Sequence, residues 1–290
     1  MQNENTIQAR PEFINAELGS VYTVVEVSLT PLQKLWRNNA FRKSLVLILL
    51  AVVWEVYART LDNELLFPTF GNTVLALVSG IGSGDIIQSA KFSLGLLLQG
   101  YVAGVVLAGL LTAFASVSRI GADFLETLTA MFNPLPSIAL LPLALIWFGL
   151  DNGSVIFVLI HAVVWAVALN THSGFRGISN TLRMVGQNYG LSRTSYVFKI
   201  LVPAALPSIL TGLKIGWAFS WRTLIAAELV FGASGNSGGL GWFIFVNKNE
   251  LLIPNVFAGL LTIILLGLFV DNLIFRQLEA RTVRRWGMVQ

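Results

Sequence analysis

The residues from 92 to 117 form a run of 26 residues without one aspartate, glutamate, lysine or arginine. A helix that crosses the hydrocarbon core of a bilayer needs about 20 such residues, so this run is long enough to span a membrane. Of the 290 residues in the chain, only 12% are charged and 55% are apolar. A soluble domain carries about 25% charged residues. We therefore expect a polytopic membrane protein rather than a soluble enzyme or a disordered chain.

Five further apolar segments bring the predicted number of transmembrane helices to six, in an all-α fold. The first is only 15 residues long, but the basic side chains on both sides of it can extend it by snorkelling. Between the first two spans, segment 65–88 is broken by Pro68 and several glycines. Its uninterrupted runs are too short to span, so we expect an interfacial loop and a short helix there. The five further spans are 44–58, 127–150, 152–175, 204–231 and 256–275.

The basic residues predict the orientation of these spans. Six spans place both termini on one side. With the N-terminus inside, the inner segments hold 14 of the 19 lysines and arginines and the outer segments hold 3. The other two, Lys214 and Arg222, lie within a span. The positive-inside rule then places both termini in the cytoplasm. The net charge of +4 reports this orientation and gives no reason to expect nucleic acid as a partner.

The first 40 residues are polar and are expected to form a cytoplasmic N-terminal extension ahead of a transmembrane domain at 41–290. No apolar stretch near Met1 resembles a signal peptide. Alternating residues from Val21 to Leu29 weakly indicate a short strand. The chain has no cysteine, which excludes disulfides and thiol catalysis.

Small residues recur on the second span. Gly100, Gly104 and Ala108 follow at four-residue spacing, with Gly109 and Ala113 beside them. Such spacing lets helix backbones approach closely. We expect close packing inside the bundle, with a dimer contact as the alternative.

The cytoplasmic loop 174–203 is the longest and best patterned. Ile178, Leu182, Val185 and Tyr189 fall on one stripe of a helix. Gly190 suits the left-handed position that ends a helix, and Ser192 can cap a second short helix that runs to Val202. Pro203 then begins the next span. A plain amphipathic surface helix is the alternative interpretation of the same pattern.

The stretch 184–207 resembles the "EAA" loop of permeases from binding-protein-dependent ABC importers. The family pattern is Glu-Ala-Ala, three residues, Gly, nine residues and Ile-x-Leu-Pro. Here Gly190 is followed by nine residues and then by Ile-Leu-Val-Pro, which ends at Pro203. Met184, Val185 and Gly186 replace the Glu-Ala-Ala triplet, so a contact that needs the glutamate cannot be transferred. The runs 221–228 and 239–242 resemble the nitrate, sulfonate, taurine and bicarbonate type.

The resemblance implies the type I importer permease fold in a bacterial inner membrane, with a second permease copy (most simply a homodimer), two ATPase subunits and a periplasmic solute-binding protein. Because the chain has no G-x-x-x-x-G-K-[ST] run, ATP and Mg are expected to bind only to the ATPase subunits. We expect no catalytic residue, metal or cofactor in this chain. The first loop helix would dock on an ATPase as a coupling helix. The residues assigned to coupling are Leu182, Arg183 at the rim, Met184, Val185, Gly186, Tyr189, Gly190 and Pro203.

Ionisable groups inside spans are costly and mark candidates for the translocation path. Arg222 is the sharpest, because guanidinium suits oxyanions. An internal ion pair, for example with Asp271, is the alternative. Glu228 lies six residues away, about 240° around the helix, and so is not its natural partner. Glu55 and Asp271 lie near span ends, and His161 fits a packing role. The residues assigned to the path are Arg222, Glu228, Lys214 and Trp221, and Trp147, Trp165 and Trp217 are further candidates for a cavity wall.

The outer segment 231–248 is rich in glycine, and its Trp242 and Phe243 suit either contact with a delivery protein or a plain flexible loop. Two other functions remain open. An ATP-independent transporter or channel fits six spans but does not explain the patterned loop. An intramembrane serine protease is suggested by serines 234 and 237 in glycine-rich surroundings, but both histidines precede them, and no strand is available for an esterase elbow.

Overall fold

The computed structural model describes residues 31–231 and 238–283, and every regular element in these two ranges is a helix, which confirms the all-α fold. The chain divides into two units, Met1–Val52 and Val53–Gln290. In the first unit, the rings of Trp36 and Phe41 pack edge to face at 6.5 Å. The predicted strand at 21–29 lies outside the described residues. The first elements are α1 (Pro31–Arg37) and α2 (Asn39–Leu61).

The second unit contains the remaining elements. Two of its segments, η2 and η3, are π-helical and continue directly into α-helices. In chain order the elements are α3 (Phe70–Ser83), α4 (Asp85–Val117), α5 (Arg119–Phe132), η1 (Ser137–Leu140), α6 (Leu141–Phe148), α7 (Asn152–Arg176), α8 (Asn180–Asn188), α9 (Arg193–Tyr196), η2 (Val197–Leu201), α10 (Val202–Phe231), α11 (Leu240–Asn249), α12 (Ile253–Phe269), η3 (Val270–Phe275) and α13 (Arg276–Arg281).

Among the described residues, four helical stretches are long and apolar enough to cross a membrane: α2, α4, α7 and the continuous helix Ile253–Arg281. Two further stretches are bent pairs. Arg119–Phe132 and Ser137–Phe148 meet at 87°, and Val197–Ala204 and Leu206–Val230 meet at 66°. The count reaches the predicted six when each bent pair is one span.

The predicted span 127–150 is the main correction. Its helix, α5, begins at Arg119, eight residues before the predicted start. The prediction began too late because it relied on uncharged residues, and the first turns of α5 contain Arg119, Asp123 and Glu126. The helix ends at Phe132, where the prolines at 134 and 136 cannot continue a helix. The second predicted span also starts early, at Asp85, directly after Gly84 in the left-handed region (φ +90°). The short helix expected within 65–88 is α3.

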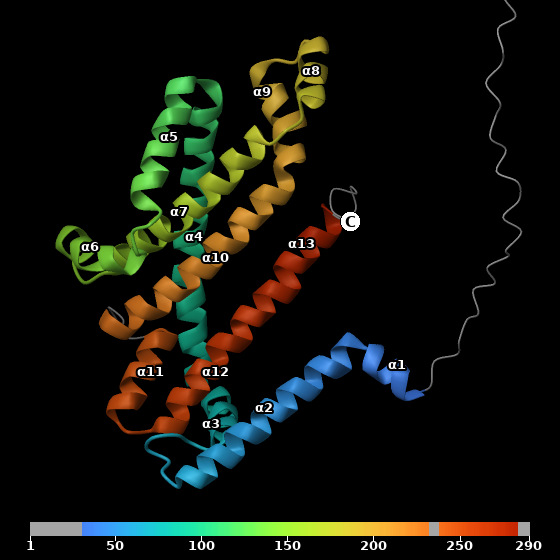
Figure 1. Ribbon diagram of the computed structural model, residues 1–290. Coiled ribbons are helices and arrows are strands. Elements are labelled where there is room, and N and C mark those ends of the chain that lie inside the picture. Colours follow the sequence, from blue (N-terminus) through green and yellow to red (C-terminus); the bar gives the residue numbers. More distant parts are fainter. Residues whose placement is uncertain (1–30, 232–237, 284–290) are drawn as a thin grey trace, which may run out of the picture. The chain divides into compact units, whose positions relative to one another are not determined.

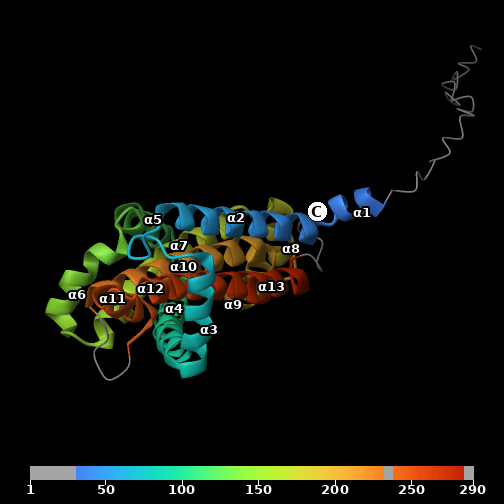
Figure 2. The same ribbon diagram turned by 90° about the horizontal axis from the view of Figure 1, so that it is seen from below.

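The core of the second unit lies where α4, α7 and α10 pack together. Figures 1 and 2 show α7 and α10 running alongside each other. A methyl group on Gly104 would lie 2.7 Å from the Val163 side chain of α7, and one on Gly100 would collide with Leu159. Ala108 is fully buried. Close packing inside the bundle is confirmed for Gly100, Gly104 and Ala108, whereas a methyl group on Gly109 would meet nothing within 4 Å and Ala113 is exposed.

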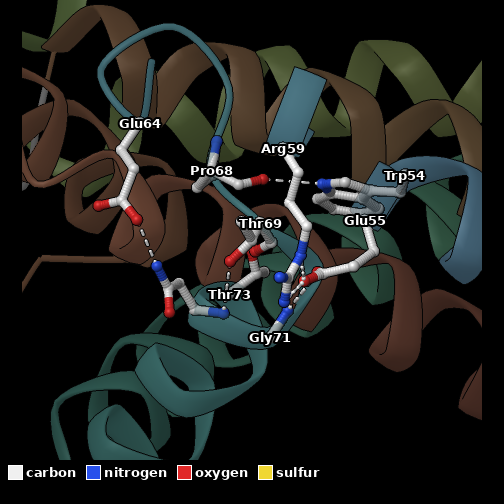
Figure 3. A network of polar contacts seen from close by, with 9 residues as sticks. Trp54, Glu55, Arg59, Glu64, Pro68, Thr69, Gly71 and Thr73 are labelled. Carbon is white, nitrogen blue, oxygen red and sulfur yellow. Dashed lines mark hydrogen bonds and ion pairs between the residues drawn. The ribbon is translucent and has the colours of Figure 1, made fainter. Parts of the chain in front are cut away.

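Polar contacts fix the end of α2 to α3 (Figure 3). The Trp54 indole N–H donates to the Pro68 carbonyl at 2.9 Å, and the Glu55 carboxylate accepts both the Arg59 guanidinium (2.7 Å) and the Gly71 backbone N–H (3.1 Å). The Trp54 ring also packs against Phe257 of α12 at 5.6 Å. Glu55, predicted to contact solvent or headgroups, keeps a side-chain exposure of 26% and also joins the end of α2 to α3.

Candidate functional site

The patterned loop forms α8 and the turn that follows it. Gly190 has φ +60°, the left-handed conformation predicted for it. Ser192 caps the next helix, since its hydroxyl accepts the Ser195 N–H at 3.3 Å. The second helix differs from the prediction. It consists of α9 and η2 and runs into α10 without a break at Pro203, and the bend lies between the two stretches that end at Ala204 and begin at Leu206.

The side of α8 that carries the coupling candidates is exposed. Figure 1 shows α8 at one end of the second unit and α11 at the other. The exposed fractions are 42% for Leu182, 39% for Val185 and 79% for Tyr189. Met184 is also exposed, whereas Ile178 is buried against Phe175 and Leu201. The predicted stripe therefore divides, with Ile178 anchoring the loop and the rest presenting an apolar surface.

Arg183 holds α8 against the end of α7. Its guanidinium donates to the carbonyl oxygens of Phe175 (3.2 Å), Arg176 (3.1 Å) and Ile178 (3.3 Å). These carbonyls belong to the last turn of α7 and its exit, where helical partners are lacking and a cation is favoured. The position predicted for the rim of an ATPase contact is thus engaged within the chain.

Gly186 lets α9 approach α8. A methyl group on Gly186 would lie 2.5 Å from the ring of Tyr196 and 3.0 Å from Ile200. Glycine at this position, where the EAA pattern has alanine, leaves room for the Tyr196 ring. The sequence alone did not indicate this contact.

A cavity of about 390 Å³ lies between the segment 133–138, which follows α5 and includes the start of η1, and helices α7 and α10. The break at the two prolines supplies one side, and successive turns of α7 and α10 supply the others. The lining residues are Asn133, Pro134, Leu135, Pro136, Ser137, Ile138, His161, Ala162, Trp165, Phe219, Arg222, Thr223 and Ala226.

Arg222 is the one predicted path residue that lines this cavity. Its side chain is exposed, and the guanidinium carbon lies 5.9 Å from the centre of the Phe219 ring. Within the described ranges it forms no ion pair, so the alternative of a pair with Asp271 is not observed. A cation–π contact neutralises no charge, and the guanidinium keeps its capacity to bind an anion.

The other predicted path residues lie elsewhere. Glu228 is 2% exposed and accepts hydrogen bonds from Ser93 and from the Gly241 N–H. Lys214 pairs with Glu279 of α13. Trp221 stacks on Trp217 in the core, with ring planes 7° apart.

Two further residues line the cavity, His161 and Trp165. The sequence pattern predicted a packing role for His161 and indicated Trp165 only as a further candidate for a cavity wall. They lie four residues apart on α7, and this spacing places them on one helical face. His161 Nδ1 lies 3.1 Å from the Ser137 hydroxyl. Trp165, one of the tryptophans suggested for a cavity wall, stacks on Phe132 with ring centres 5.3 Å apart. Trp147, another of those tryptophans, is 58% exposed and does not line the cavity.

The outer segment 231–248, expected to contact a delivery protein or to be a plain flexible loop, is in part a helix, α11, which contains both Trp242 and Phe243. Gly239 and Gly241 hold its start against Glu228, where a side-chain carbon would collide. Serines 234 and 237, on which the protease alternative rests, lie outside the described residues.

The second unit thus combines two bent helix pairs, a cavity lined from α7 and α10, and a helix, α8, that exposes apolar side chains. The family model described as "Binding-protein-dependent transport system inner membrane component" matches residues 100–284, more than half of the chain. The chain belongs to this family, and the predicted resemblance to its permeases is confirmed.

The chain is also similar to named permease proteins of nitrate and taurine transport. The nitrate import permease protein NrtB of Synechocystis is 29% identical, and the match covers 84% of this chain and 90% of that protein. The taurine transport system permease protein TauC of Escherichia coli is also 29% identical, covering 84% of this chain and 88% of that protein. The similarity therefore extends over nearly the full length of both proteins.

Proposed function

We propose that this chain forms the translocation path for a small anionic solute in an ATP-driven importer, with Arg222 as the anion-binding group of that path. The observation that carries the proposal is the guanidinium of Arg222, which lines a cavity between spans and forms no ion pair within the described ranges. An arginine at membrane depth is costly and is retained where it has a functional partner. The names of NrtB and TauC, which refer to nitrate and taurine, support a small anionic solute.

The proposed assembly pairs two copies of this chain with two ATPase subunits and a periplasmic solute-binding protein. The chain lies in a bacterial inner membrane with both termini on the cytoplasmic side. The 14 basic residues in the inner segments support this orientation. The exposed apolar residues of α8 (Leu182, Met184 and Val185), with Tyr189 directly after it, are proposed to dock on the ATPase. ATP and Mg bind to the ATPase subunits.

The test is uptake by proteoliposomes that contain the complete transporter, with labelled nitrate, bicarbonate, taurine and alkanesulfonates as substrates. Arg222→Gln removes the charge and should reduce uptake at least tenfold, whereas Arg281→Gln, at an exposed site on α13, is the matched control. Normal uptake by a folded Arg222→Gln transporter would disprove the role of Arg222.

A co-purification experiment separates the importer from an ATP-independent transporter or channel. The chain is extracted in mild detergent from its native membrane, and its partners are identified. An ATPase subunit in stable stoichiometry supports the importer. Uptake that persists without any ATPase subunit would favour the alternative.

A further inference from the structure

Two residues that line the Arg222 cavity each carry a buried polar atom without a hydrogen-bond partner. The atoms are Trp165 Nε1 and His161 Nε2. Indole nitrogen is only ever a donor. When the Ser137 hydroxyl donates to His161 Nδ1, the neutral ring carries its proton on Nε2, which then is a donor as well. Buried donors without partners are rare in proteins and call for an explanation.

A bound oxyanion would satisfy these donors together with Arg222. Guanidinium can hold two oxygens of one oxyanion through parallel hydrogen bonds. The remaining lone pairs of such a group can accept from the two α7 donors. His161 and Trp165 lie on one face of α7, and Phe219 and Arg222 lie three residues apart on α10, so residues of two helices line one cavity.

Most of the rest of the wall is apolar, and Asn133, Ser137 and Thr223 are its other polar residues. Ile138, Ala162, Phe219 and Ala226 line the cavity, and the Trp165 ring is held in place by its stack with Phe132. A volume of about 390 Å³ lies in the range of sites that hold organic ligands. An inorganic oxyanion of four or five atoms would leave most of this apolar wall against water, whereas a hydrocarbon group would cover it.

We propose that Trp165 and His161, together with Arg222, form a selectivity site within the membrane for an oxyanion that carries an organic group. The oxyanion accepts from the three donors, and the hydrocarbon part packs against the aromatic wall. This proposal rests on the proposed function of the same cavity and adds that the permease itself favours organic over inorganic anions.

Equilibrium dialysis of the full-length chain in lipid nanodiscs tests the site with labelled benzenesulfonate as the probe and nitrate as the competitor. Benzenesulfonate should bind at least tenfold more tightly than nitrate. Trp165→Phe keeps the stack on Phe132 and removes only the donor, so the dissociation constant should rise about tenfold, the factor for one hydrogen bond to a charged group. Trp147→Phe is the matched control, because Trp147 is exposed and does not line the cavity.

The possible results distinguish three claims: the preference for an organic group, the role of the Trp165 donor and the role of Arg222. Equal affinities for nitrate and benzenesulfonate, both lost in Arg222→Gln, would overturn the preference for an organic group and leave the anion path intact. Unchanged benzenesulfonate binding by Trp165→Phe would overturn the role of that donor. If no anion binds in a manner that depends on Arg222, the selectivity site is refuted, and the uptake assay of Arg222→Gln decides separately whether the path itself stands.

Discussion

The buried hydroxyl of Ser93 on α4 donates to the carboxylate of Glu228 on α10 at 2.7 Å. The same hydroxyl oxygen accepts the N–H of Leu240 at 2.9 Å, and the second carboxylate oxygen accepts the N–H of Gly241 at 2.8 Å. Three helices therefore meet at one carboxylate. This arrangement favours a packing role for Glu228 over direct contact with the solute.

Glu228→Ala should destabilise the folded chain by about 2 kcal/mol, because Ser93 and the N–H of Gly241 would be left buried without an acceptor. Glu228→Gln keeps an acceptor for Gly241 and should cost less. Thermal unfolding in detergent measures both, with the exposed Glu250→Ala as control. A Glu228→Ala variant of normal stability that fails only in uptake would place Glu228 in the solute path after all.

Two glycines on α4 offer a matched pair. Gly104→Ala places a methyl group 2.7 Å from Val163 and 3.2 Å from the Ile160 carbonyl, and should cost about 1–3 kcal/mol through overpacking. Gly109→Ala meets nothing within 4 Å and should be neutral or slightly stabilising, because alanine favours a helix. Equal unfolding temperatures of the two variants would contradict the close approach of α4 and α7.

Arg183→Gln should loosen α8 from α7, because the charged hydrogen bonds to three carbonyl oxygens are lost. In the complete transporter we expect ATP hydrolysis to continue while uptake per ATP falls severalfold. Lys199→Gln, in the same loop and also exposed, is the control. An unchanged ratio of uptake to hydrolysis would show that these contacts do not transmit motion.

The pair of Lys214 and Glu279 predicts a rescue by charge reversal. Lys214→Glu and Glu279→Lys should each lower the unfolding temperature, and the double reversal should recover most of the loss. Both side chains are about one-third exposed, so we expect a coupling energy of at most about 1 kcal/mol in a double-mutant cycle. Zero coupling, combined with altered uptake in Lys214→Glu, would support the path role predicted from the sequence.

Val185→Asp provides the cleanest test of docking at α8. Val185 is 39% exposed, so the charge should disrupt an apolar contact with the ATPase and abolish co-purification while the chain still inserts normally. Gly186→Asp is a poorer test, because Gly186 is packed against Tyr196 and its replacement disturbs the loop itself. Retention of the ATPase by Val185→Asp would mean that this face of α8 is not the docking surface.

Much of the fold follows from composition and spacing. Uncharged runs located the spans, and the spacing around Gly190 predicted both the turn and the family. The span 127–150 was drawn too late because Asp123 and Glu126 sit in the first turns of α5, where exposure near the membrane surface tolerates charge.

The site could be predicted only in part. A costly charge singles out Arg222 without knowledge of its neighbours. Glu228 bonds to Ser93 and Lys214 pairs with Glu279. Both partners are distant in sequence, so no local pattern predicts these contacts. His161 and Trp165 carry a local signal, their four-residue spacing, but their lack of partners is visible only in three dimensions.

The 87° break after Phe132 has a consequence for the surroundings of the chain. A continuous helix keeps its backbone hydrogen bonds to itself and can face lipid tails, whereas irregular backbone at membrane depth requires water or protein beside it. The break falls within the predicted span 127–150, about 9 Å of helix beyond Glu126, the last charged residue of α5. Arg222 shares the cavity wall with the broken segment. We therefore expect this side of the molecule to face water or another protein subunit. A single copy of the chain surrounded by lipid would expose the broken segment to lipid tails.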